Sequence, residues 1–127
     1  MVSLDNFEAL FLNEINKNKA SHYFLAVSGG CDSMVLLHLF IKHKLPCSVL
    51  HVNYNLRGIE STQDCETVRE LCEKQSIAFH MHSCDLETSL NNGGNLQNKA
   101  REIRYAFFKT KLKTIPLSTI CLAHQNN

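Results

Sequence analysis

The stretch that decides the fold of this chain is Phe24-Leu25-Ala26-Val27-Ser28-Gly29-Gly30-Cys31-Asp32-Ser33-Met34-Val35-Leu36-Leu37. Its apolar first part predicts a strand, its glycine pair a tight turn, and its apolar last part a helix. Two consecutive glycines let the backbone bend sharply and let a ligand come close. The first turn of the helix offers unpaired N–H groups and a partial positive charge, so the stretch predicts an anion site, most often for phosphate.

Two well-known phosphate-binding patterns are absent from this stretch. No Gly-Lys-Ser/Thr follows at the spacing of the lysine-bearing phosphate loop, and the glycines do not form Gly-x-Gly-x-x-Gly. A plainer interpretation is that the glycines only make a turn and that Asp32 and Ser33 only cap the helix. The ligand-binding interpretation is favoured because six consecutive residues fit it in a strand–turn–helix context.

Those six residues, Ser28-Gly29-Gly30-Cys31-Asp32-Ser33, resemble the Ser-Gly-Gly-x-Asp-Ser signature of the PP-loop, or N-type, ATP pyrophosphatases. The resemblance implies that the loop holds the pyrophosphate of ATP. It also implies that AMP is transferred to a carbonyl-type oxygen with release of pyrophosphate, and that a nucleophile then displaces AMP. The signature defines the superfamily, whereas the substrate must be sought in the rest of the chain.

The bulk composition is that of an ordinary globular domain. With 127 residues and 44% hydrophobic residues the chain can bury a core as one domain. The net charge of +1 gives no general sign of nucleic-acid binding. The apolar runs are too short to span a bilayer and no secretory leader is evident, so we expect a cytoplasmic location and no membrane contact. The six cysteines are scattered without a C-x-x-C pair, which favours reduced thiols over a disulfide framework.

Apolar periodicity predicts an alternation of helices and strands. The helices are expected over residues 3–17, 34–44, 61–75 and 96–113, and the strands over residues 23–27, 47–52, 77–82 and 118–123. A long polar connection is expected over residues 84–94. The alternation predicts an α/β fold with a parallel sheet, right-handed crossovers and helices on both faces. The first helix is expected to pack on the sheet, with contact to a substrate as the alternative.

Three further stretches resemble the N-terminal PP-loop domain of the tRNA(Ile)-lysidine synthetase family. They are His51-Val52-Asn53-Tyr54-Asn55-Leu56-Arg57-Gly58, the run from Asn95 to Phe108 that contains Ala100-Arg101 and Arg104-Tyr105, and Leu122-Ala123-His124-Gln125-Asn126-Asn127. The resemblance covers residues 24–127 in order. It implies a PP-loop ATPase fold, of the adenine nucleotide alpha hydrolase-like kind. It also implies a strand order of 3-2-1-4, which sets the Ser-Gly-Gly loop opposite His124.

The resemblance also implies a reaction and its reactants. With ATP and Mg²⁺, the family activates the wobble cytidine of an isoleucine tRNA that carries a CAU anticodon. L-lysine then attacks the activated base, which gives lysidine, AMP and pyrophosphate. The residues expected to bind the nucleotide are Ser28, Gly29, Gly30, Cys31, Asp32, Ser33, His51 and Asn53.

Catalytic roles are expected at Asp32, Arg101, Arg104 and His124. Asp32 is also the expected Mg²⁺ ligand, because magnesium takes few protein ligands and prefers hard oxygens. Arg101 and Arg104 lie three residues apart on one expected helix face and could reach a phosphate or the RNA backbone. The alternative is a solvated face in which they pair with Glu102.

Other polar residues carry weaker expectations. Arg57 could also bind a phosphate or could be an ordinary loop arginine. His51 could be only the end of a buried strand. His80 and His82 have no motif context and are expected to be packed or solvated rather than metal ligands. The lysines near the end of the last helix, Lys109, Lys111 and Lys113, are expected to favour the helix C-terminus more than to bind RNA.

The chain departs from the family pattern at two places. Tyr54 stands where a second histidine is usual, and Asn127 stands where a carboxylate is expected, which weakens magnesium binding there. Because the chain stops directly after a strand, we expect it to be the truncated N-terminal part, residues 1–127, of a PP-loop domain in a longer protein. The alternatives are another PP-loop adenylating enzyme, such as a tRNA thiolation enzyme, and an ATP-binding module without catalysis. The cytidine-modifying thiolation enzymes use paired C-x-x-C cysteines, which this chain lacks.

Overall fold

A computed structural model describes residues 4–17, 19–53, 59–83 and 96–122. In chain order the elements are α1 (Leu4–Lys17), β1 (His22–Ala26), α2 (Cys31–Lys42), β2 (Cys47–Asn53), α3 (Ile59–Lys74), β3 (Ala78–Ser83), α5 (Leu96–Leu112) and β4 (Ser118–Leu122). The predicted alternation is confirmed, with element ends that differ by a few residues. The largest difference is the start of α2. The amide of Met34 already donates to the carbonyl of Gly30 at 3.1 Å, so residues 31–33 form the first turn.

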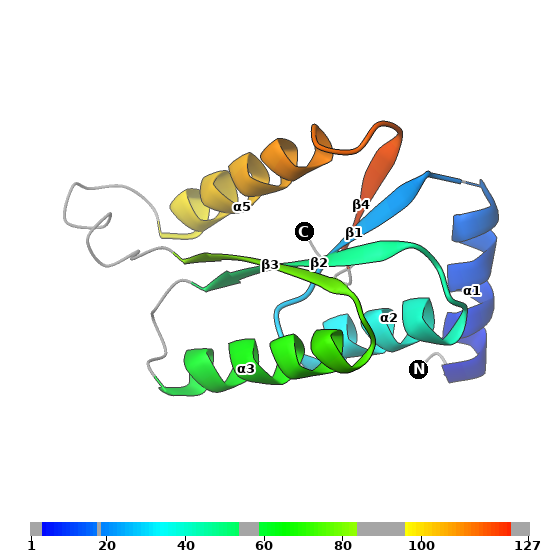
Figure 1. Ribbon diagram of the computed structural model, residues 1–127, viewed down its shortest axis with the longest axis horizontal. Helices are drawn as coiled ribbons and strands as arrows, with labels where there is room; N and C mark the ends of the chain where they lie inside the picture. The colour runs from blue at the N-terminus through cyan, green and yellow to red at the C-terminus, as the bar shows by residue number, and fades with distance from the viewer. Residues whose placement is uncertain (1–3, 18, 54–58, 84–95, 123–127) are drawn as a thin grey trace.

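The four strands form one parallel sheet in the order β3-β2-β1-β4, as the family resemblance predicted. In the register, Leu25 of β1 lies between Val49 of β2 and Cys121 of β4. Successive strands extend in one direction from β1 to β3, and the chain then crosses back to the other side of β1 with β4 (Figure 1). The reversal of strand order therefore falls between β1 and β4, where parallel sheets bind ligands at their carboxyl edge.

Helices cover both faces of the sheet, as predicted: α2 and α3 lie on one face and α5 on the other (Figure 1). Leu25 packs on the first face with Phe40 of α2 and Val68 of α3. Phe24 points to the second face and packs with Leu50 and with Phe108 of α5. Because Leu25 and Phe40 are both 0% exposed, truncating either to alanine should cost about 2–5 kcal/mol.

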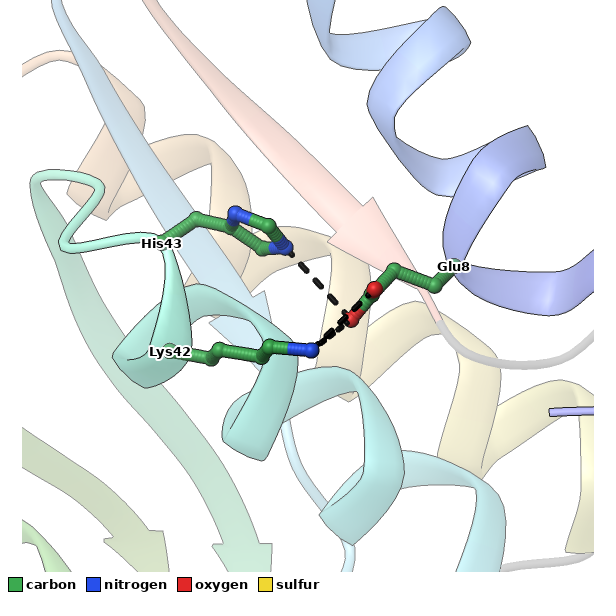
Figure 2. Close-up of polar contacts among 3 residues, drawn as sticks. All are labelled: Glu8, Lys42 and His43. Carbon is green, nitrogen blue, oxygen red and sulfur yellow. Dashed lines mark hydrogen bonds and ion pairs between the residues drawn. The ribbon is translucent and has the colours of Figure 1, made fainter. Parts of the chain in front are cut away.

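Helix α1, which the sequence predicts to pack on the sheet, is attached to α2 instead by contacts of Phe11 and Glu8. Phe11 of α1 meets the ring of Phe40 edge-on, with 5.0 Å between the centroids. Near this contact, Glu8 Oε2 lies 2.8 Å from Lys42 Nζ and 3.5 Å from His43 Nε2 (Figure 2). An apolar anchor and an ion pair therefore attach α1 to the C-terminal end of α2.

Two histidines of the sheet, His82 and His22, have a packed or polar partner in the protein. His82 stacks on Phe107 with 5.3 Å between the ring centroids, and His22 Nε2 lies 2.7 Å from Ser48 Oγ. Burial lowers the pKa of His22, and burial together with the nearby Lys111 and His22 lowers the pKa of His80. Within the described residues, no group of three or more histidine, cysteine or acidic side chains is arranged to hold a metal ion.

The described cysteines are free thiols: Cys31, Cys47, Cys65, Cys72 and Cys121. Burial raises the pKa of Cys47, Cys72 and Cys121 to about 11, so these thiols are protonated at neutral pH and behave as apolar core residues. No helix in the described part of the chain is both long enough and apolar enough to cross a membrane.

Candidate functional site

The turn between β1 and α2 needs one of its two glycines for its backbone conformation. Gly29 has a φ of 99°, a region that side chains strongly disfavour. Gly30 is extended, with φ −73° and ψ 169°, and an added Cβ would meet only Ser28 Oγ, at 3.5 Å. Gly29 is therefore needed for the turn itself. At Gly30 neither the backbone conformation nor the surrounding space requires glycine.

Ser33 holds the turn together from inside. Its Oγ accepts the amide hydrogens of Ser28 at 3.2 Å and Gly29 at 3.3 Å, and it donates to the carbonyl of Gly30 at 3.1 Å. The amide of Gly30 in turn donates to Ser28 Oγ at 3.2 Å. Ser33 is only 5% exposed, so its hydroxyl supports the loop's shape. Direct contact of Ser33 with a nucleotide stays a prediction.

The N-terminus of α2 opens directly from this loop. Gly30 is its N-cap residue, and no side chain in the described structure caps the helix by a hydrogen bond. The amide groups of the first turn, together with the helix dipole, are therefore suited to an anion. Cys31 and Asp32 are exposed in this turn. The positive end of the helix dipole stabilises the negative charge of the Asp32 carboxylate. Because Asp32 is exposed to solvent, a divalent cation can reach its carboxylate.

The predicted nucleotide-binding residues fall into two groups. Ser28, Gly30, Cys31 and Asp32 are exposed and Gly29 is half-buried, and all five lie in the loop or the first turn of α2. In contrast, Ser33, His51 and Asn53 are buried, with exposed fractions of 5%, 3% and 9%. The exposed group follows the carboxyl end of β1 along the chain. Of the buried group, Ser33 and His51 bond to the backbone of Ser28 and Val27, and Asn53 is the last residue of β2.

His51 is connected to the start of the loop by a hydrogen bond. Its Nδ1 lies 2.8 Å from the carbonyl oxygen of Val27, the residue before Ser28. Its ring stacks on Phe79 of β3, with 6.2 Å between centroids and 27° between the ring planes. Sequence reasoning missed Phe79 as part of the site. Strand alternation indicates the face on which Phe79 lies, but nothing in the sequence identifies the ring that it meets.

The two predicted arginines lie on the same side of α5 as its buried aromatic residue. Arg104 precedes the buried Phe108 by four residues and Arg101 precedes it by seven, spacings that fall on one helical face. Because α5 runs antiparallel to the strands (Figure 1), its N-terminal half, which contains Arg101, lies towards the carboxyl edge of the sheet, and Arg104 lies at the middle of the helix. Arg101 is exposed and Arg104 half-buried, and among the described residues neither forms an ion pair. His124, Arg57, Tyr54 and Asn127 lie outside the described residues, as does the connection over residues 84–94.

Comparisons with solved structures identify the fold. An NMN synthetase from Francisella tularensis matches 90% of this chain with a TM-score of 0.66 at 20% identity, and 52% of its own chain is covered. An NH3-dependent NAD synthetase from Campylobacter jejuni matches 92% of this chain with a TM-score of 0.64 at 16% identity, and 53% of its own chain is covered. At such identities the likeness concerns the fold alone.

Comparisons of sequence give the family. Curated proteins named tRNA(Ile)-lysidine synthase are 40% identical in Malacoplasma penetrans and 39% identical in Mycoplasma genitalium, over 83% of this chain in both cases. The chain covers only 35% and 34% of these two relatives, so it spans about a third of their length. The family model described as a PP-loop domain matches residues 4–127. Since that match includes the Ser-Gly-Gly loop and all described elements of the sheet, the chain belongs to the PP-loop domain family.

Proposed function

We propose that this chain is the ATP-binding part of a tRNA(Ile)-lysidine synthetase that acts in the cytoplasm. In the proposed reaction, a carbonyl oxygen of the wobble cytidine in a CAU anticodon attacks the α-phosphorus of ATP. The bond from that phosphorus to pyrophosphate breaks, which leaves an adenylated base. The amine of L-lysine then attacks the activated carbon of the base, and AMP leaves with the electrons of the broken bond.

One observation carries the proposal: the uncapped N-terminus of α2 opens from a loop that satisfies its own polar groups. The hydroxyl of Ser33 and that of Ser28 take up the amides of residues 28–30, so these groups already have partners. The first-turn amides of α2 have no side-chain cap and face the edge where strand order reverses. Such preorganised donors stabilise the negative charge that develops on a departing pyrophosphate.

The charged side chains fit the same chemistry. Asp32 is exposed beside these amides, and a site for Mg²⁺ usually combines one or two carboxylates with the phosphates of the substrate. Asp32 would hold the ion, which when bound would neutralise phosphate charge. We assign Arg101 and Arg104 to the phosphates or the tRNA backbone, where a guanidinium can bind in a bidentate manner. We also assign His124 the catalytic role that the family resemblance implies for it.

The decisive experiment is isotopic pyrophosphate exchange into ATP. It should be run with the chain and with a chimera. In the chimera, the aligned 83% of this chain replaces the matching 34% of the Mycoplasma genitalium relative. Exchange by the chimera should require tRNA(Ile) with a CAU anticodon, and addition of L-lysine should give lysidine. Exchange supported equally by other tRNAs would favour a different adenylating enzyme, such as a tRNA thiolation enzyme. Binding of Mg·ATP without exchange in either protein would favour a binding module.

A further inference from the structure

The peptide unit between Val27 and Ser28 is held at both ends by side chains from other elements. Its carbonyl oxygen lies 2.8 Å from Nδ1 of His51 on β2. Its N–H group donates to Oγ of Ser33 on α2, at 3.2 Å. Because a peptide unit is planar and rigid, two bonds at its opposite ends fix the orientation of the whole plane. This plane is the point at which the chain leaves the sheet and enters the loop.

His51 acts where the main-chain pairing of β1 and β2 ends. The last bond between these segments runs from the amide of Val27 to the carbonyl of Leu50, at 3.0 Å. The next polar group along the chain is the Val27 carbonyl, which accepts its hydrogen bond from the His51 side chain. A carbonyl oxygen can only accept, so Nδ1 carries the hydrogen. The side chain thus satisfies a buried carbonyl while the backbone turns away towards Gly29.

The imidazole of His51 is itself held in place. It is 3% exposed, and it stacks on Phe79 of β3. The guanidinium of Arg69 on α3 lies 5.7 Å from the centroid of the Phe79 ring. Contacts from β3 and α3 therefore restrict the ring that restrains the loop, and a ring so deeply buried has little surface left for a ligand.

We propose that His51 is a positioning residue for the PP-loop, which acts through the Val27–Ser28 peptide and not by touching the nucleotide. The hydrogen bond sets the direction in which the loop leaves β1 and thereby aims the first-turn amides of α2. The nature of the ligand, the pyrophosphate of ATP, rests on the proposed function. The positioning role rests only on the contacts of His51, Val27, Ser28 and Ser33.

The test compares His51→Asn with His51→Leu, two side chains of nearly the same shape. The asparagine amide can donate from about the position of Nδ1, whereas leucine cannot donate. In His51→Leu, amide hydrogen exchange at Ser28 and Gly29 should be roughly tenfold faster or more, because a buried carbonyl loses its partner. In His51→Asn it should stay within about threefold of wild type, since the donor is restored. Val49→Ala is the control, because it removes core packing from the same strand without touching this bond.

Equal exchange at Ser28 in wild type and His51→Leu, measured relative to the amides of β1, would overturn the positioning role. If both substitutions prevent folding, the wild-type protein still decides the question. The ¹⁵N shifts of the His51 ring report whether Nδ1 carries a hydrogen, and a bare Nδ1 would contradict the proposal. Calorimetry should show Mg·ATP binding weakened about tenfold in His51→Leu and little changed in His51→Asn. Failure of the wild type to bind Mg·ATP would remove the proposed function, while the exchange data would still decide the role of His51.

Discussion

The two ends of helix α2 are built in opposite ways. At its N-terminus, no side chain in the described residues caps the helix, and Cys31 and Asp32 are exposed. At its C-terminus, the amide of His43 donates to the carbonyl of Leu39 and the amide of Lys44 to that of Ile41, both at 3.1 Å. Lys44 ends the helix in the left-handed region, with a φ of 53°. One end leaves its backbone groups available, while the other end satisfies them.

This difference between the two ends of α2 assigns ligand binding to its N-terminus and a contribution to stability to its C-terminus. Open amides at a helix N-terminus cost little in water but gain strong partners when an anion binds. The C-terminal end instead contacts α1 through the Glu8–Lys42 pair and the packing of Phe11 on Phe40 (Figure 2). We therefore expect changes at the first end to alter ligand binding and changes at the second end to alter stability.

The largest effect is expected from Asp32→Asn at the open end. Replacing the carboxylate by an amide weakens Mg²⁺ binding, so pyrophosphate exchange by the chimera should fall on the order of 100-fold or more. The circular dichroism spectrum and the melting temperature should stay close to those of the wild type, because Asp32 is exposed. Glu73→Gln, an exposed acid at the end of α3, is the matched control. Full activity in Asp32→Asn would refute the assignment.

The next effect is a contrast between Gly29→Ala and Gly30→Ala. At a φ of 99° alanine is strained, so Gly29→Ala should lower the free energy of unfolding by about 1–2 kcal/mol. The loop must also shift to relieve the strain, so Mg·ATP affinity should drop. Gly30→Ala keeps an allowed conformation and should cost only about 0.5 kcal/mol, from its N-cap position. Urea unfolding and calorimetry measure both quantities, and equal effects of the two substitutions would contradict the described turn.

A smaller effect is expected in the chemical labelling of Cys31. Its thiol is exposed in the first turn of α2, whereas Cys65 and Cys72 are buried. Iodoacetamide should therefore modify Cys31 before those two residues, as mass spectrometry of the peptides can show. Saturating Mg·ATP should slow the modification of Cys31 several-fold by covering the turn. Labelling of Cys31 that does not respond to bound nucleotide would place the ligand elsewhere.

The smallest effect is expected from Glu8→Gln at the closed end. The hydrogen bond from Lys42 lowers the pKa of Glu8 from its ordinary value. A carboxylate with a lowered pKa stabilises the fold above its unfolded pKa, and this contribution is lost as pH falls through the folded pKa. Because the Lys42 side chain is 63% exposed and solvent screens the pair, the wild type should melt only slightly above Glu8→Gln at neutral pH, and the difference should vanish in acid. A difference independent of pH, or a change in Mg·ATP affinity, would contradict the separation of the two ends.

Much of the fold follows from local patterns. The apolar run of β2 is enough to predict a buried strand, and the alternation of Phe79 and His80 predicts β3 and its two faces. Apolar periodicity begins only at Met34 and therefore predicts the start of α2 three residues late. The helix begins at Cys31, because the backbone hydrogen bond from Met34 to Gly30 closes its first turn. Apolar periodicity does not detect this turn, because residues 31–33 carry polar or small side chains.

The candidate site is less predictable from sequence than the fold. The position of Asp32 just after the glycine turn follows from the order of residues along the chain. The buried positions of Ser33 and His51 do not, since a serine or histidine in a motif can equally face a ligand or hold the backbone. Only their partners distinguish these roles: two loop amides for Ser33 and the Val27 carbonyl for His51.

The amino-acid sequence alone establishes that a strand, a glycine turn and a helix follow one another at residues 24–37, because these features depend on neighbouring residues and on the conformational freedom of Gly29. The tertiary structure adds contacts between residues that are far apart in the chain. His51 of β2 donates a hydrogen bond to the Val27 carbonyl, and Glu8 of α1 pairs with Lys42 at the C-terminal end of α2. These contacts join residues that are 24 and 34 positions apart in the chain. They arise only when the strands and helices pack together, so no local pattern can encode them.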